Sequence, residues 1–263
     1  MNQKKFFPKT YIKFFEGIGE VSFLFYQTLI NTFRKPWEKK IFIRQLEEIG
    51  VNSLPVVTLT AAFTGLVYAL WGYIGFHRYI GPGSESYAGP VIALGLVKEL
   101  IPVLVGLMVA GRICASIAAE IGSMKVTEQI DALYTLGADP IKYLVVPRTI
   151  AAFLMLPLLT IFGDAIGLLC SYGYMVYIMK VNKYLYYSVT LQYIETWDVI
   201  TGLIKASSFG IIIAIIGCYY GLKTEGGAQG VGRSTTNSVV VASILILIVN
   251  FFWSKFLPST LHQ

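Results

Sequence analysis

Residues 89–119 read GPVIALGLVKELIPVLVGLMVAGRICASIAA. Only Lys98, Glu99 and Arg112 in this stretch carry a charge. As an α-helix it would be about 46 Å long at about 1.5 Å per residue, more than the roughly 30 Å hydrocarbon core of a bilayer. The stretch therefore predicts a transmembrane helix that tilts or bends. Pro102 is the expected bend point because it lacks an N–H and its ring clashes with the preceding turn.

The rest of the chain repeats this apolar pattern. Of 263 residues, 55% are hydrophobic and 14% are charged, whereas a soluble domain carries about 25% charge. This composition argues against a disordered chain, a secreted disulfide scaffold and an ordinary soluble enzyme. It predicts an all-α integral membrane protein with one transmembrane domain at residues 53–257. The apolar runs place five spans at about 55–75, 89–119, 149–179, 200–222 and 238–257.

The distribution of Lys and Arg predicts the orientation of the spans. The segment before the first span and the loops on its side hold 14 of them, and the opposite loops with the C-terminal end hold 4. Cytoplasmic loops are enriched in Lys and Arg. We therefore expect a cytoplasmic N-terminus and, because the number of spans is odd, a C-terminus on the outer side.

Residues 1–52 are expected to form amphipathic helices at the cytoplasmic membrane surface. Between Lys13 and Arg34 the polar residues recur at helical spacing along one narrow stripe. A second helix is expected after Pro36, since proline suits the first helical turn. The basic side chains of both helices would meet anionic lipid heads. The alternative is an extra span at residues 14–33, which its charged residues disfavour.

Ionisable side chains within spans are costly and indicate function. Lys98 and Glu99 lie about 15 Å into the second span, near the bilayer midplane, and adjacent helical residues point about 100° apart. Lys205 lies near the start of the fourth span. We favour a polar site in a substrate pathway, suited to a zwitterionic or anionic lipid headgroup. The alternative is structural pairing, for example with Asp164 of the third span.

Arg112, Ser116 and Glu120 fall on one helical face at the cytoplasmic end of the second span. Their spacing of four residues predicts an intrahelical ion pair that lines a helix contact. We therefore assign Arg112 and Glu120, together with Asp164, a structural role.

The loop at residues 120–148 is expected to contain a short helix. Thr127 can cap it, Glu128 and Asp131 fall in its first turn, where acidic groups favour the helix dipole, and Gly137 would end it. An acidic helix that projects from a cytoplasmic loop is suited to docking a soluble partner. The alternative is a surface helix with no partner.

Catalytic and metal-binding patterns find little support. Three cysteines are scattered through apolar runs, and the two histidines lie outside the spans. Residues 227–234 (GAQGVGRS) nearly match the G-x-x-x-x-G-K-[ST] phosphate loop, but Arg233 replaces the lysine and a membrane helix precedes it where a strand is required. We expect no enzyme activity, metal or cofactor in this chain. The alternatives to a transport subunit are an intramembrane lipid-modifying enzyme and an ATP-independent channel or scaffold.

Several longer motifs together resemble the MlaE/YrbE permease family, in register over roughly residues 15–257. They are GVNSLP at 50–55, LVKELIPVL at 96–104, GLMVAGR at 106–112, EIGSMKVTEQIDAL at 120–133, GADPIKYLVVPR at 137–148 and GGAQGVGRSTT at 226–236. The resemblance implies an ABC transporter permease that moves phospholipids between membranes, or into plastids in the chloroplast branch. Its expected location is the bacterial inner membrane, with the plastid inner envelope as the alternative.

The same resemblance implies the partners. They are a second copy of the chain in a homodimer, a cytoplasmic ABC ATPase that binds the ATP, an MCE-domain protein on the outer side, and a STAS-domain accessory protein. No nucleic acid is among them. ATP-driven closure of the ATPases would push on a helix at residues 126–136 and squeeze an apolar cavity that holds a diacyl lipid.

The resemblance also assigns residues. Glu128 and Asp131 would belong to the coupling helix that meets the ATPase, and Lys98, Glu99 and Lys205 would lie near the lipid cavity at the dimer interface. Some relatives carry Arg at the position of Lys98 and an acidic residue at that of Asn250.

Overall fold

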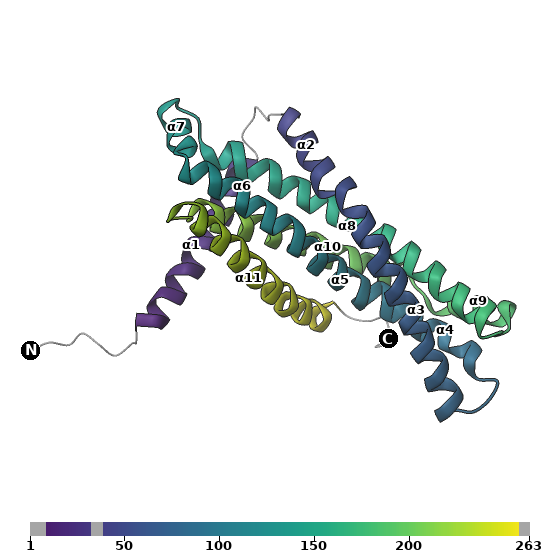
Figure 1. The fold of residues 1–263 in the computed structure, drawn as a ribbon. Coiled ribbons are helices and arrows are strands. Elements are labelled where there is room, and N and C mark those ends of the chain that lie inside the picture. Colours follow the sequence, from purple (N-terminus) through teal and green to yellow (C-terminus); the bar gives the residue numbers. More distant parts are fainter. Residues whose placement is uncertain (1–8, 33–38, 258–263) are drawn as a thin grey trace, which may run out of the picture.

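The computed structural model describes residues 9–32 and 39–257, and within these ranges it contains helices and no strand. Among the described residues, five helical runs are long and apolar enough to cross a membrane, which confirms the predicted number of spans. Figure 1 shows the runs packed lengthwise in one bundle. They cover Lys40–Tyr79, Glu85–Val126, Ile141–Ile178, Thr196–Leu222 and Gly227–Phe256.

The spans are built from the following elements. The first contains α3 (Leu54–Tyr79), and the second contains α4 (Ala88–Gly95), α5 (Ile101–Val109) and α6 (Ala115–Val126), joined by the π-helical turns η3 (Leu96–Leu100) and η4 (Ala110–Cys114). The third contains α8 (Val146–Gly173) between the π-helical turns η5 (Ile141–Val145) and η6 (Tyr174–Ile178). The fourth is α10 (Thr196–Leu222) and the fifth is α11 (Gly227–Phe256).

Two helices precede α3, in the region where the sequence predicts amphipathic helices. They are α1 (Lys9–Thr32) and α2 (Lys39–Ile49), while Arg34 and Pro36 lie outside the described residues. Helix α2 continues through the 3₁₀ turn η1 (Val51–Ser53) into α3, and together they form most of the run Lys40–Tyr79. Helix α1 packs on α10 and α8, and α2 packs on α8. That either helix lies in a lipid interface stays a prediction.

Two short helices mark the opposite ends of the bundle. Helix α7 (Gln129–Thr135) extends from one end and α9 (Lys183–Tyr193) covers the other (Figure 1). The sequence analysis did not predict α9, although Asn182 gives a clear start signal: its side chain accepts hydrogen bonds from the N–H groups of Tyr184 and Leu185, at 3.0 and 3.2 Å.

The glycine-rich stretch at 227–234 forms the first turns of α11, not a loop. Gly226 adopts a left-handed conformation with φ of 88° and reverses the chain directly before it. The fifth helix therefore starts well before the expected residue 238. A helical backbone here also removes the phosphate-cradling conformation that the motif would need.

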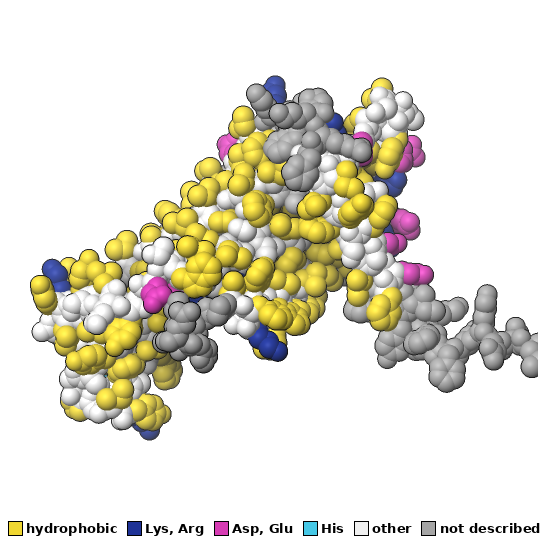
Figure 2. All heavy atoms as spheres, turned by 180° about the vertical axis from the view of Figure 1, so that it is seen from behind, with side chains coloured by type: hydrophobic (Ala, Val, Ile, Leu, Met, Phe, Trp, Pro, Cys, Tyr) yellow, Lys and Arg dark blue, Asp and Glu magenta, His cyan; other side chains and the backbone are white. Residues whose placement is uncertain are grey.

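Hydrophobic side chains cover most of the outer surface. Figure 2 shows them spread over one face of the bundle, with few charged side chains among them. The interior contains large aliphatic side chains together with small residues at close helix contacts, and α10 has the largest buried share among the five candidate spans of the described residues. A Cβ atom at Gly210 would lie 2.5 Å from the carbonyl oxygen of Ala152 on α8. The backbones of α8 and α10 are therefore in direct contact.

We expect Gly210→Ala to lower the stability of the protein, because the new methyl group would overlap backbone atoms of α8 and overpacking costs about 1–3 kcal/mol. Gly111→Ala is the matched control, since no atom lies within 4 Å of its added Cβ and alanine favours a helix by about 0.5–1 kcal/mol. Thermal unfolding in detergent should show a lower melting temperature for Gly210→Ala and an equal or higher one for Gly111→Ala. Equal values for both variants would contradict the tight α8–α10 contact.

Candidate functional site

The π-helical turn η3 exposes a backbone carbonyl in the middle of the second span. In an α-helix the carbonyl of Lys98 would accept a hydrogen bond from the N–H of residue 102, but residue 102 is proline and has none. The π turn η3 ends two residues before Pro102, the expected bend point, and the Lys98 carbonyl is left without this α-helical donor and open to a partner from another helix.

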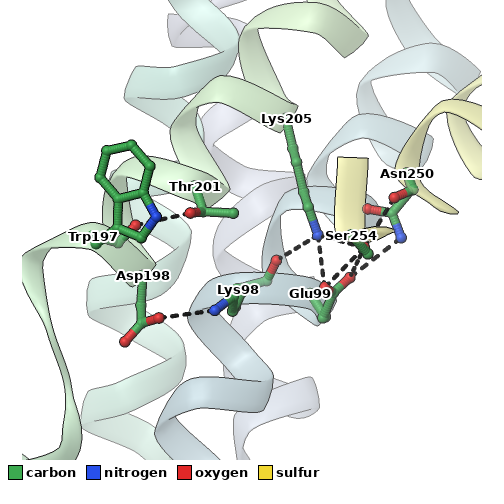
Figure 3. Close-up of polar contacts among 8 residues, drawn as sticks. All are labelled: Lys98, Glu99, Trp197, Asp198, Thr201, Lys205, Asn250 and Ser254. Carbon is green, nitrogen blue, oxygen red and sulfur yellow. Dashed lines mark hydrogen bonds and ion pairs between the residues drawn. The ribbon is translucent and has the colours of Figure 1, made fainter. Parts of the chain in front are cut away.

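Lys205 on α10 supplies that partner. Its ammonium donates to the Lys98 carbonyl at 3.1 Å, to Glu99 Oε1 at 2.7 Å and to Ser254 Oγ at 2.8 Å (Figure 3). An ammonium has three N–H donors, so all three are used. The side chain is fully buried. Gly202 brings α10 close enough, because a Cβ there would lie 2.6 Å from the Val97 carbonyl oxygen.

Glu99 is the part of this cluster that reaches the surface. Besides Lys205, its carboxylate contacts Ser254 Oγ at 2.9 Å and Asn250 Nδ2 at 3.3 Å, both on α11. The Glu99 side chain is 40% exposed, whereas that of Lys205 is 0% exposed. The carboxylate, not the ammonium, is therefore the charged group that a ligand can reach.

Lys98 points away from Glu99 and pairs with Asp198 at the start of α10, at 3.0 Å (Figure 3). The second oxygen of Asp198 accepts the N–H of Glu195 at 3.1 Å in a capping box. The sequence analysis did not identify Asp198 as a site residue, because it placed the start of the fourth span at residue 200. Its distance of seven residues from Lys205, two helical turns on one face, is a signal that could have found it.

Structural pairing, the alternative that the sequence analysis left open, is present for both Lys98 and Glu99, but with partners other than Asp164. Lys98 and Glu99 are both paired, with residues of α10, and neither contacts Asp164. Asp164 is buried in α8, and neither of its carboxyl oxygens has a hydrogen-bond partner within the described part of the chain. The π turn instead ties the second span to the fourth and fifth.

The expected intrahelical pair between Arg112 and Glu120 is wrong. Arg112 donates to the carbonyl of Glu48 at 3.1 Å and to Ser53 Oγ at 2.7 Å, so it holds the junction of α2 and α3. Glu120 pairs with the buried Arg148 of α8 at 2.8 Å. Both side chains reach across helices because the two residues are eight apart and cannot touch each other.

The coupling element forms as a helix but starts differently from the prediction. Thr127 caps nothing in α7; its hydroxyl donates to the Ser123 carbonyl at 2.9 Å and ends α6. Glu128 is the N-cap residue in a left-handed conformation, and Asp131 pairs with Lys125 at 3.0 Å. Gly137, with φ of 75°, ends the helix as expected.

A polar cluster fastens α1 to the C-terminal end of α10. Glu20 accepts hydrogen bonds from Lys223 and from Tyr219, the latter at 2.6 Å. The hydrogen bond from Lys223, and then that from Tyr219, lowers the pKa of Glu20 below its usual value of 4.5. The hydrogen bond to Glu20 is the main cause that raises the pKa of Lys223 above 10.5.

Known proteins are similar in sequence to most of this chain. The family model described as Permease MlaE matches residues 42–256, from α2 to the end of α11. A probable ABC transporter permease protein of Rickettsia conorii is 51% identical and covers 92% of this chain and 93% of its own length. One of Synechocystis is 41% identical over 91% of this chain and 90% of its own. The chloroplastic protein TRIGALACTOSYLDIACYLGLYCEROL 1 of Arabidopsis thaliana is 39% identical over 81% of this chain and 60% of its own.

We expect Lys205→Met to destabilise the protein, because it leaves the Lys98 carbonyl and the Glu99 carboxylate without their ammonium partner. Removing one member of a buried pair costs about 3–5 kcal/mol, and the partial exposure of Glu99 reduces this. Thermal unfolding should show a clearly lower melting temperature for Lys205→Met. Lys255 is an exposed lysine of α11, and Lys255→Met should change the melting temperature little. In a double-mutant cycle, Glu99→Gln should lower the free energy of unfolding by less in the Lys205→Met background than in the unchanged protein. Additive losses would contradict the pair.

The attachment of α1 to α10 should depend on pH. The depressed pKa of Glu20 contributes stability that is present above 4.5 and lost as pH falls through the lower folded value. The raised pKa of Lys223 contributes stability that is present below 10.5 and lost as pH rises through the higher folded value. Hydrogen exchange of α1 amides, corrected for intrinsic rates, should be slowest between these limits. Lys223→Met should speed it at neutral pH, and Lys183→Met at the far end should not; unchanged exchange in Lys223→Met would refute the attachment.

Proposed function

The chain belongs to the MlaE permease family, and from that premise we propose that it moves phospholipids between membranes as the membrane subunit of an ABC transporter. Membership makes the chain a permease subunit and not an enzyme. What we propose beyond family membership is that the cargo is a phospholipid and that the chain works with an ATPase and further partner proteins.

The main observation in favour of a lipid cargo is a charged cluster at the edge of an apolar membrane surface. Glu99, Asn250 and Ser254 lie beside a hollow of about 350 Å³ on α11, lined by Val249, Phe252, Trp253 and Phe256. A polar group next to an apolar hollow suits an amphipathic molecule, since hydrocarbon needs apolar walls and a headgroup needs a few polar contacts. The name of the Arabidopsis relative contains a galactosylated diacylglycerol, a lipid that carries two acyl chains on glycerol as a phospholipid does.

A second copy of the chain would complete this site. On α11 only Ser238, Ala242 and Ile246 are buried, and apolar side chains remain exposed along the helix. These are Val240, Ile244, Leu247, Ile248, Phe251, Phe252 and Phe256. A homodimer that pairs α11 with its counterpart would enclose the Glu99 cluster and the hollow in a shared cavity.

The ATPase would bind at the α7 end of the bundle. Tyr134 and Leu136 expose apolar surface there, beside the acidic groups of Glu128 and Asp131. Helix α7 follows α6 directly, and α6 belongs to the same span as the Glu99 turn. A push on α7 can therefore reach the cluster through one continuous helical run. ATP is bound and hydrolysed by the partner, and we propose no cofactor for this chain.

The remaining partners follow from the resemblance of the sequence motifs. We place an MCE-domain protein at the opposite, α9 end, where it would receive the lipid, and a STAS-domain protein with the ATPase. The membrane would be the bacterial inner membrane, with the N-terminus in the cytoplasm; chloroplast and plastid relatives make the plastid inner envelope the alternative.

The test is to purify the tagged chain from native membranes, identify bound proteins and lipids by mass spectrometry, and measure ATP-dependent lipid transfer in liposomes. We expect an ABC ATPase and phospholipid to co-purify. Glu99→Gln and Lys205→Ala should each reduce bound phospholipid and transfer several-fold, because each breaks the headgroup cluster. Lys255→Gln is the control on α11 and should change neither.

Glu99→Gln keeps the shape of the side chain but weakens the pair with Lys205, so lipid binding and transfer are compared at equal amounts of folded protein. Unchanged lipid binding and transfer in both cluster variants would refute the headgroup site. Transfer without ATP would favour a channel or scaffold instead, and lipid modification by the isolated chain would favour an enzyme.

A further inference from the structure

A second apolar pocket lies at the α9 end of the bundle, with a volume of about 600 Å³. Its walls come from three elements: Ala93 of α4, Leu168, Leu169 and Tyr172 of α8, and Tyr187 and Leu191 of α9. It includes none of the residues of the Glu99 cluster. Its volume falls within the range of about 300–1,000 Å³ that is typical of small-molecule sites.

Residue size explains why the three helices leave this space. Helix α9 packs tightly on α4 at Gly89, where an added Cβ would lie 3.1 Å from the Tyr186 ring. One turn further along α4 is Ala93, and Ala165 of α8 also lines the pocket, so two small side chains stand where larger ones would fill it. The pocket therefore follows directly from the sequence at these positions.

The lining offers hydrocarbon surface and no free charge. No Lys, Arg, Asp, Glu or His lines it among the described residues. The hydroxyls of Ser171 and Thr190 donate to the carbonyls of Leu168 and Tyr186, at 2.9 and 2.6 Å. Burial raises the pKa of Tyr186 to about 12, an effect that a hydrogen bond with Ser171 partly offsets. A charged headgroup would find no partner here, whereas an alkyl chain would.

We propose that this pocket binds an acyl chain of a bilayer lipid from the leaflet at the α9 end. Leu169, Tyr187 and Leu191 are exposed at its mouth, so it opens toward the surrounding membrane. Tyr184 and Tyr193 on the same helix are also exposed. Because tyrosine is enriched at membrane–water interfaces, we place α9 at the level of the lipid headgroups.

The chemistry of the lining suits an acyl chain. An alkyl chain makes no hydrogen bonds, and the Ser171 and Thr190 hydroxyls of the pocket already donate to backbone carbonyls. A flexible chain can follow an irregular pocket of this volume. The pocket also reaches Ile194, directly before the Glu195 capping box that holds Asp198 near Lys98. A bound chain would therefore steady the turn that positions one of the two ion pairs.

The experiment uses the complex purified from native membranes and placed in phosphatidylcholine nanodiscs with a trace of phosphatidylcholine that carries a photoreactive diazirine in one acyl chain. After irradiation, mass spectrometry maps the labelled residues. We expect several-fold more label at residues 168–172 and 184–193 than on the exposed α8 surface at residues 158–162. Ala165→Trp, which fills the pocket from an exposed position, should reduce the α9 label several-fold.

Leu158→Trp is the matched control on the same helix and should leave the α9 label unchanged, as should Glu99→Gln, which belongs to the proposed transport site. Even labelling of all exposed surfaces, or an α9 label that Ala165→Trp does not reduce, would overturn the proposal. So would an α9 label that occurs in the isolated chain but is absent from the intact complex, because a protein partner would then occupy the pocket. None of these outcomes depends on lipid transport.

Discussion

The buried ammonium of Lys205 is the constraint on which the arrangement of the spans depends. A charge that is withdrawn from water must be paired and hydrogen-bonded, or the protein loses several kcal/mol. Lys205 meets this condition with three oxygens, from the backbone of one span and the side chains of two. The second, fourth and fifth spans must therefore keep a fixed register at this level. Displacing any of the three would leave a buried donor without an acceptor.

Two backbone features make this contact possible, and neither is itself charged. Pro102 removes the N–H that would otherwise occupy the Lys98 carbonyl, and the preceding π turn makes room for the bend. Gly202 lets α10 approach the bend at the Val97 carbonyl. The polar cluster is thus built on a helix defect. Within a bilayer such a defect is tolerated only where a neighbouring helix satisfies the freed group.

The position of the cluster connects structure to transport. It lies in the same span as α6, which leads to the α7 end, and it contacts α11, the candidate span with the smallest buried share. In the proposed function, separating α11 from the second span would expose Glu99 further, and closing them would expel a bound headgroup.

The sequence by itself determined the class of the protein and its five spans, because runs of apolar residues of membrane length admit few other folds. It also singled out Lys98, Glu99 and Lys205, since charges in such runs are rare. It placed Arg112 with Glu120, and it omitted Asp198 and α9. Only the tertiary structure decided which charge pairs with which, because hydrogen-bond partners in a membrane are chosen across helices. Periodicity reports the faces of one helix and contains no information on its neighbours.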